Sequence, residues 1–232
     1  MDWSWDVFFT YLVDREFVLA ALATLAVTCA AQALATVIGI VLALAALSRS
    51  RILRLLSAAY LWIWRGTPPL IQLLVLYFGL PQLGIRLSVL EAGLIGLSCY
   101  GGAYMSEIVR AAIRSVDDGQ VQAARSLGFG RLETLGTIVL PQALRVALPP
   151  FGNEFASMLR TSALLSVISF EELLRVTTLA INDTFRPAEL YAVAALYYLV
   201  MTSLWMILQH GLERRMRFDG TRALTDLAFP AT

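Results

Sequence analysis

Residues 17–47 read FVLAALATLAVTCAAQALATVIGIVLALAAL, and no charged side chain interrupts them. Their polar members are limited to threonine, cysteine and glutamine. An α-helix needs about 20 predominantly apolar residues to cross the hydrocarbon core of a bilayer. The run therefore predicts a transmembrane helix, and because it exceeds that length we expect the helix to tilt or to protrude.

Four further apolar stretches follow this run. The first of them is interrupted by Arg65-Gly66-Thr67-Pro68-Pro69, which must kink a helix because proline removes a backbone donor. The chain of 232 residues is 58% hydrophobic and 15% charged, whereas soluble domains carry about 25% charged residues. We therefore predict an all-α polytopic membrane protein with five transmembrane helices. The four later stretches are residues 55–80, 87–109, 143–170 and 190–209.

The arginines are distributed unevenly between the two sides of these predicted spans. Three groups follow the first, third and fifth spans, which places all three on one side of the membrane. Cytoplasmic loops carry an excess of basic residues, so the sequence predicts an external N-terminus and a cytoplasmic C-terminus. The groups are Arg49, Arg51 and Arg54; Arg110, Arg114, Arg125, Arg131 and Arg145; and Arg214, Arg215, Arg217 and Arg222.

These spans divide the chain into three parts. Residues 1–16 form an external N-terminal segment, residues 17–212 form one transmembrane domain, and residues 213–232 form a cytoplasmic tail. Within the domain, residues 116–142 form a large cytoplasmic loop. Residues 170–189 are polar enough for an external loop, and their apolar spacing predicts a short amphipathic helix within it.

The residue inventory excludes several chemistries. All 18 basic residues are arginine, whereas a phosphate-binding P-loop needs a lysine on the phosphates of ATP. We therefore expect no ATP hydrolysis by this chain, and no cofactor of its own. A metal site or a disulfide is not expected either. Cys29 and Cys99 lie in apolar runs without CxxC spacing, and His210 has no cluster of ligands around it.

The cytoplasmic loop has the pattern of two short helices joined by a sharp turn. Asp117 or Asp118 can cap the first helix, and Gly128 suits the left-handed conformation that ends it. Pro141 is expected to block continuation of the second helix. The pattern predicts a helix–turn–helix elbow outside the membrane. The apolar stripe of its second helix would consist of Leu132, Leu135, Ile138 and Val139.

The spacing within this elbow resembles the EAA loop of ATP-binding-cassette importer permeases. That pattern is Glu-Ala-Ala, three residues, glycine, nine residues, isoleucine, one residue and Leu-Pro. The chain matches every step but has glutamine in place of the usual glutamate. The resemblance implies a coupling helix that docks on a partner ATPase, and the two small alanines would let that surface approach closely. The matching residues are Gln122, Ala123, Ala124, Gly128, Ile138, Leu140 and Pro141.

Further stretches resemble the polar amino acid permeases, which include histidine, glutamine, arginine and opine transporters. The resemblance extends over residues 42–214, and it implies a type I importer transmembrane domain in the bacterial cytoplasmic (inner) membrane. It also implies that the solute is a polar amino acid. The signature residues are Arg65, Gly66, Thr67, Pro68 and Gln72, and Leu140-Pro141-Gln142 is similar to the same group.

The predicted fourth span carries ionisable residues, which are costly at membrane depth and are candidates for function. A zwitterionic substrate needs both signs of charge together with polar donors, and Glu154 and Arg160 supply the charges. Alternatively, both residues lie near the membrane faces and only anchor the helix. The candidate pathway residues are Asn153, Glu154, Arg160, Thr161 and Ser162.

The resemblance implies the partners as well. They are an ATPase subunit that binds ATP and magnesium, a second permease subunit in a homodimer or heterodimer, and an external solute-binding protein. The lipid bilayer surrounds the chain, and no nucleic acid is expected. One alternative is the same kind of permease for a quaternary amine or a methionine-like solute. A secondary transporter would usually need more spans or an inverted repeat, and an intramembrane enzyme would need paired catalytic carboxylates in one span.

Overall fold

The computed structural model describes residues 2–216, and every regular element within that range is helical. The all-α prediction is therefore confirmed. Residues 217–232, which include the predicted cytoplasmic Arg217 and Arg222, lie outside the described residues. The α-helices are α1 (Trp5–Leu12), α2 (Arg15–Leu47), α3 (Arg51–Gly66), α4 (Pro69–Leu74), α5 (Val89–Arg114), α6 (Asp118–Ser126), α7 (Arg131–Thr134), α8 (Leu140–Thr161), α9 (Leu173–Thr184) and α10 (Pro187–Met216).

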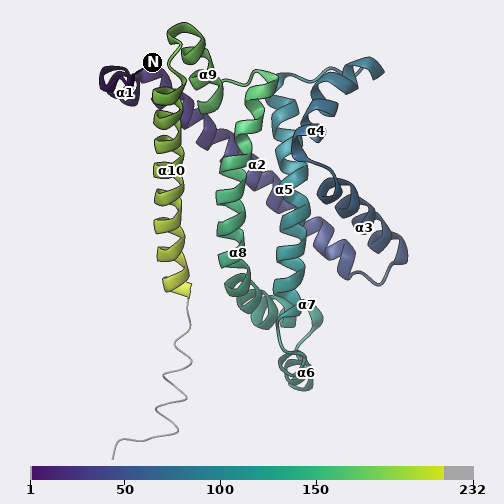
Figure 1. Cartoon of the computed structure of the whole chain (residues 1–232). Coiled ribbons are helices and arrows are strands. Elements are labelled where there is room, and N and C mark those ends of the chain that lie inside the picture. The colour runs from purple at the N-terminus through teal and green to yellow at the C-terminus, as the bar shows by residue number, and fades with distance from the viewer. Residues whose placement is uncertain (1, 217–232) are drawn as a thin grey trace, which may run out of the picture.

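Most of the long helices stand along one axis, α3 and α4 lie to one side of them, and the remaining short helices lie at the two ends (Figure 1). Helices α5, α8 and α10 are upright, and α2 crosses behind them on a diagonal. Helices α1 and α9 lie at one end of the bundle, whereas α6 and α7 project beyond the other end. The fold thus separates two candidate contact surfaces by the full length of the bundle.

Two helices in the described range are long and apolar enough to cross a membrane by length and composition. These are α2 and α10, with mean hydropathies of 2.3 and 1.7 in their most apolar windows. The other predicted spans are shorter or carry more polar residues. The stretch 55–80 is divided between α3 and α4, while α8 contains Pro149 and Pro150 together with charged residues.

Small residues bring α2 and α5 together over most of their length. Ala31 and Ala35 on α2 are fully buried. A β-carbon added at Gly102 would lie 2.5 Å from a methyl carbon of Ile38, and one added at Gly39 would collide with Met105. Helices approach this closely only where side chains are small, as is common for pairs inside membranes.

Two wide π-turns precede prolines, and they correct one expectation. Pro141 does not stop the helix. The chain runs from α7 through the π-turn η3 (Leu135–Val139) directly into α8, with the Leu140 N–H bonded to the carbonyl of Leu135, five residues earlier. The wider turn makes room for a proline ring that would otherwise clash with the carbonyl four residues before it. A second π-turn, η1 (Val75–Gly79), precedes Pro81 in the same way.

The predicted amphipathic helix in the loop 170–189 is confirmed as α9. Glu172 caps it and is fully buried, and its carboxylate accepts hydrogen bonds from the Arg175 N–H at 2.8 Å and the Tyr198 hydroxyl at 2.9 Å. Burial raises the pKa of the Glu172 carboxyl, although these hydrogen bonds oppose the shift. The cap therefore fastens α9 to α10.

Candidate functional site

The elbow of α6 and α7 is built from two local devices. Asp117 caps α6, since its carboxylate accepts a hydrogen bond from the Gly119 N–H at 2.7 Å. At the other end, the Gly128 N–H donates to the Arg125 carbonyl and the Phe129 N–H donates to the Ala124 carbonyl. This is the Schellman arrangement, which requires a left-handed residue, and Gly128 has φ of 89°. The predicted sharp turn is confirmed.

The side chains of the elbow face two ways. Gln122 and Ala123 are exposed, but Ala124 is only 5% exposed and faces its own chain. Small size at Ala124 therefore serves packing within the elbow. Of the expected apolar stripe, Val139 is buried, whereas Leu132 is 85% exposed. Leu127, which sequence reasoning passed over, is 79% exposed beside it in the turn region. The outward face of the elbow is thus more apolar than its sequence pattern indicated.

A pair of glutamines fastens the elbow to the bundle. The side-chain amide of Gln142 on α8 donates to the side-chain oxygen of Gln120 on α6 at 2.6 Å, and lies 2.9 Å from the Ile138 carbonyl. Beneath this pair, Val116, Val139 and Ala143 form a small apolar cluster. The elbow is therefore held to α5 and α8 by both a polar contact and an apolar cluster.

The signature Arg65, Gly66, Thr67, Pro68 and Gln72 forms the break between α3 and α4. Helix α3 ends at Gly66, Thr67 is extended, and α4 begins at Pro69. Pro68 has no N–H, so the Trp64 carbonyl loses its helical partner. The Gln72 amide replaces it at 3.0 Å and also lies 3.0 Å from the Thr67 carbonyl. Gln72 is buried, and its position explains why a glutamine follows the two prolines.

Replacing Gln72 with leucine should destabilise the protein. It would leave the Trp64 and Thr67 carbonyls without their side-chain donor, and a buried polar group without a partner costs about 1–3 kcal/mol. We expect a lower Tm for the detergent-solubilised chain. Gln82→Leu is the matched control because Gln82 is exposed. Equal Tm values for the two variants would show that the break does not depend on Gln72.

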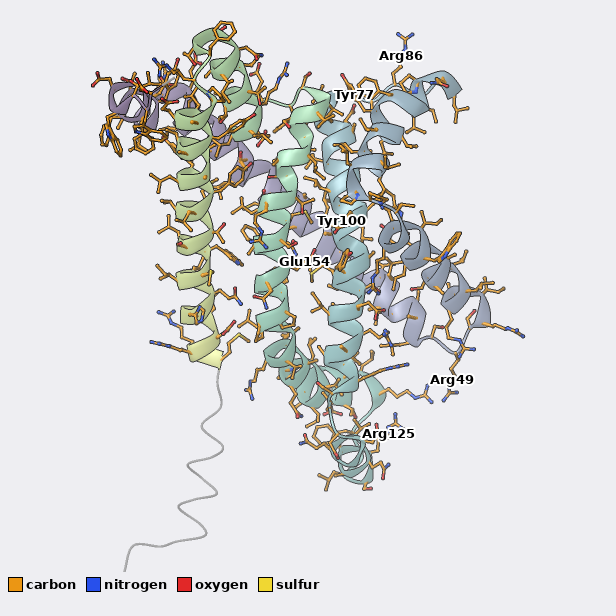
Figure 2. The ribbon with its side chains drawn as sticks, in the orientation of Figure 1. Arg49, Tyr77, Arg86, Tyr100, Arg125 and Glu154 are labelled. Atoms are coloured by element: carbon orange, nitrogen blue, oxygen red, sulfur yellow. The ribbon has the colours of Figure 1, made fainter. Side chains whose placement is uncertain are left out.

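A row of polar side chains crosses from α8 to α3. The Glu154 carboxylate on α8 lies near Tyr100 on α5 (Figure 2). The rings of Tyr100 and Tyr104 lie 5.0 Å apart, and the Arg65 guanidinium lies 5.4 Å from the centre of the Tyr104 ring. Sequence reasoning named Glu154 and Arg65 separately, and the structure connects them through two tyrosines.

The other candidate pathway residues are placed less favourably. Arg160 lies six residues beyond Glu154, about 9 Å along the helix axis, and both it and Asn153 are exposed. Ser162 is fully buried, with its hydroxyl bonded to the Leu159 carbonyl, and the Thr161 hydroxyl is bonded to the Ser157 carbonyl. At Ser162 helix α8 changes into the 3₁₀ segment Ser162–Ile168.

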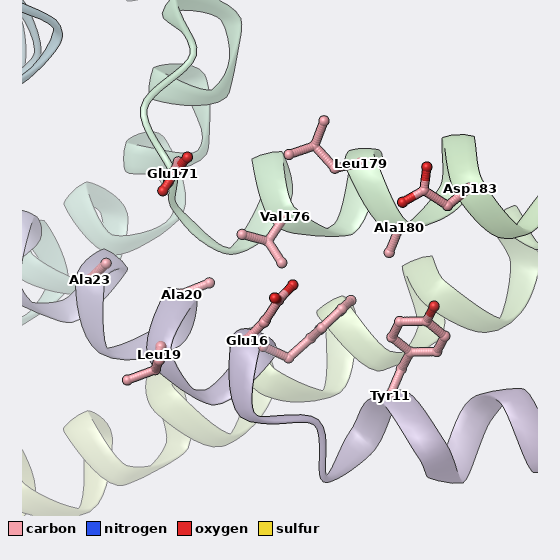
Figure 3. A pocket seen from close by; sticks show the side chains of 11 residues that line it. Tyr11, Glu16, Leu19, Ala20, Ala23, Glu171, Val176, Leu179, Ala180 and Asp183 are labelled. Atoms are coloured by element: carbon pink, nitrogen blue, oxygen red, sulfur yellow. The ribbon is translucent and has the colours of Figure 1, made fainter.

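An acidic cavity of about 490 Å³ lies at the opposite end of the molecule from the elbow. It is bounded by α2 on one side and α9 on the other, with Tyr11 from α1 at its edge (Figure 3). Three carboxylates line it, from Glu16, Glu171 and Asp183. The described residues contain no group of acidic, histidine or cysteine side chains arranged to hold a metal ion.

A helical bundle with membrane-length helices, a polar row across its middle and an elbow beyond one end has the architecture of a membrane transport subunit. A family model described as binding-protein-dependent transport system inner membrane component matches residues 35–218. The arginine transport system permease protein ArgU of Corynebacterium glutamicum is 37% identical, over 96% of this chain and 75% of its own length. A probable amino-acid permease protein, YxeN of Bacillus subtilis, is 36% identical over 88% of this chain and 96% of its own.

Solved structures agree with these relatives. The crystal structure of an amino acid ABC transporter with histidines superimposes with a TM-score of 0.86 at 36% identity, covering 93% of this chain and all of that chain. The MetNI methionine ABC transporter in an inward-facing conformation shares the fold, with a TM-score of 0.74 at 18% identity, over 87% of this chain and 96% of its own.

The chain belongs to the family of binding-protein-dependent transport system inner membrane components. It is thus a permease subunit of an ATP-binding-cassette importer rather than its ATPase.

Proposed function

We propose that this permease forms the translocation pathway for a polar amino acid. The observation that carries the proposal is the row Glu154, Tyr100, Tyr104 and Arg65, which presents a carboxylate, hydroxyls and a guanidinium from α8, α5 and α3. A zwitterionic solute needs both signs of charge along its path. The names of the relatives, among them arginine and glutamine transport permeases, support the same class of solute.

The proposed membrane arrangement has five spans. Helices α2, α5, α8 and α10 each form one, and α3 with α4 forms the other around the break at Thr67. Residues 1–16 are then external, residues 17–212 form the transmembrane domain and residues 213–232 form a cytoplasmic tail. This arrangement puts the acidic cavity outside and the elbow, residues 116–142, inside. The protein thus presents opposite ends to two kinds of partner.

Coupling to ATP is assigned to the elbow. A partner ATPase, which binds ATP and magnesium, holds the elbow at the exposed residues Gln122, Ala123 and Leu127, and closure of the ATPase pushes the elbow. Gln142 and the apolar cluster below it pass the movement to α5 and α8. Ile138 lies in the wide turn η3 that joins the elbow to α8, and Leu140 and Pro141 are the first two residues of α8. A second permease subunit completes the pathway, and an external solute-binding protein delivers the amino acid to the outer end.

The pathway assignment places Glu154 and Asn153 on the side of α8 that is available to solute. Arg160 and Thr161 lie further toward the outer end of the same helix, where they would meet solute earlier. Ser162 can contribute to the pathway only by starting the 3₁₀ turn, since its hydroxyl is buried.

Substrate binding is tested by competition. Unlabelled arginine, glutamine and histidine should compete with labelled substrate for uptake, whereas methionine and a quaternary amine should not.

Topology can be tested with two single cysteines. In a background where Cys29 and Cys99 are replaced by alanine, Asp183→Cys should react with a membrane-impermeant maleimide on intact cells. Ser126→Cys should react only after permeabilisation, because the arginine distribution places the elbow inside. Both positions are exposed. External labelling of Ser126→Cys in intact cells would refute the proposed orientation.

A further inference from the structure

Helix α1 has three sides with different surroundings. One side packs on the chain, where Phe8, Tyr11 and Leu12 adjoin the apolar cluster that contains Phe17 and Leu190. Because residues four apart lie on the same face of a helix, the remaining exposed residues separate into two further sides. One of these two sides is apolar and the other is polar.

The second side of α1 is apolar and exposed. Trp5 is 61% exposed, Phe9 is 56% exposed and Val13, which follows the helix, is 78% exposed. These residues follow one another at intervals of four. The third side is polar, with Asp6 and Thr10 exposed at the same interval. Scattered exposed apolar residues are ordinary in proteins, but a continuous side of them next to a polar side is the pattern of a helix at a membrane surface.

The aromatic residues of this segment form a connected group. The rings of Trp3 and Trp5 lie 5.4 Å apart, and those of Trp5 and Phe9 stack at 5.9 Å. Tryptophan concentrates at membrane–water interfaces, where its ring is apolar and its N–H can reach a polar partner. The group therefore offers a surface suited to the boundary between lipid headgroups and acyl chains.

The orientation of α1 against α10 is fixed by hydrogen bonds. The Ser4 N–H donates to the carboxylate of Glu189 at 2.9 Å, and the Tyr197 hydroxyl donates to the Leu12 carbonyl at 2.8 Å. The Arg186 guanidinium donates to the Asp2 carbonyl at 2.8 Å. At its other end, α1 is joined to α2 through Val13 and Asp14 alone. Figure 1 shows α1 lying across the end of α10 rather than along it.

We propose that α1 is an interfacial anchor in the outer leaflet of the bilayer. Trp5, Phe9 and Val13 lie among the lipid headgroups and upper acyl chains, and Asp6 and Thr10 face water. The occupant of the apolar side is lipid, because the first turns of α2 and α10, which adjoin α1, also expose apolar side chains, namely Val18, Leu22 and Tyr191. This proposal rests on the membrane-spanning roles given to α2 and α10 above. The anchor fixes the depth of both outer helix ends.

Spin labels at neighbouring positions test this proposal. The full chain, with Cys29 and Cys99 replaced by alanine, receives Phe9→Cys or, as the matched control, Thr10→Cys, and is reconstituted with its ATPase in lipid vesicles. Frequent collisions of the spin label with oxygen indicate that the label lies in lipid. Frequent collisions with a water-soluble nickel complex indicate that it lies in water. The label at position 9 should lie about 5–10 Å below the headgroup phosphates, and the label at position 10 should be on the water side. Val13→Cys provides an independent position with the same expected depth as position 9.

Two outcomes for the labels would overturn the proposal. Equal exposure to nickel at positions 9 and 10 would place the whole helix in water. Shielding of position 9 from both reagents would mean that protein, either a second copy or the solute-binding protein, covers this side. Uptake is measured on the same vesicles after ATP is supplied on the ATPase side and the solute-binding protein is added on the other side. If the label at position 9 lies at membrane depth but the vesicles do not transport, α1 is an interfacial anchor and the proposed transport function is wrong.

Discussion

Replacing Gly128 with valine should lower ATP-driven uptake by about tenfold. Gly128 has φ of 89°, and a residue with a β-carbon loses about 1–2 kcal/mol in the left-handed region. Since 1.4 kcal/mol corresponds to a factor of ten, the equilibrium constant that favours the turn directing α6 outward would fall by about that factor. The measurement is uptake of labelled amino acid into vesicles that contain the permease, its ATPase and the solute-binding protein.

Two variants control for this result. Gly136→Val places the same side chain in the same loop, at a position with open space and no positive φ, and should transport normally. Gly128→Asn should retain most activity because asparagine tolerates the left-handed conformation. If Gly128→Val transports like the parent protein, the turn is not required for coupling and the role assigned to the elbow is wrong.

Replacing Glu154 with glutamine should raise the KM for uptake by about tenfold or more. The carboxylate is the acidic member of the polar row and would meet the ammonium group of a passing amino acid. Removing one partner of a desolvated, hydrogen-bonded charge pair costs about 2–5 kcal/mol, although part of that cost falls away where water reaches the pathway. The measurement is uptake rate against amino acid concentration.

The comparison with Glu154→Asp separates charge from shape. Aspartate keeps the negative charge on a shorter side chain, so its KM should lie between those of the parent and of Glu154→Gln. Copurification of the ATPase with both variants shows that the complex is assembled. An unchanged KM for Glu154→Gln would assign Glu154 to anchoring of α8, which is the alternative raised by its position in the sequence.

Features that depend on neighbouring residues could be predicted from the sequence. The uninterrupted run 17–47 forms one helix, with Asp14 as its cap. The elbow could also be predicted, because the αL glycine, the aspartate cap and the spacing between them are local features of the sequence. The amphipathic spacing in residues 170–189 predicted helix α9 for the same reason. In each case the residues that make the structure lie within one or two helical turns of one another.

Features that depend on distant partners could not be predicted in this way. Pro141 should stop a helix on local grounds, yet a π-turn accommodates it within the packed bundle. The role of Gln72 depends on carbonyls freed by a proline four residues before it, and that of Gln142 depends on Gln120 across the elbow. Tyr100 gave no signal in the sequence because a tyrosine in an apolar run is ordinary. It became a candidate only when α5 and α8 were placed together.

The most direct test of the central claim is ATP-driven uptake into vesicles loaded with ATP on the cytoplasmic side. The claim is that this chain carries a polar amino acid across the membrane by coupling, through its elbow, to a separate ATPase. We predict that uptake requires the permease, the ATPase, the solute-binding protein and ATP together, and that the permease alone neither hydrolyses ATP nor accumulates substrate. Accumulation by the permease alone, driven by an ion gradient and unaffected by ATP, would contradict the account.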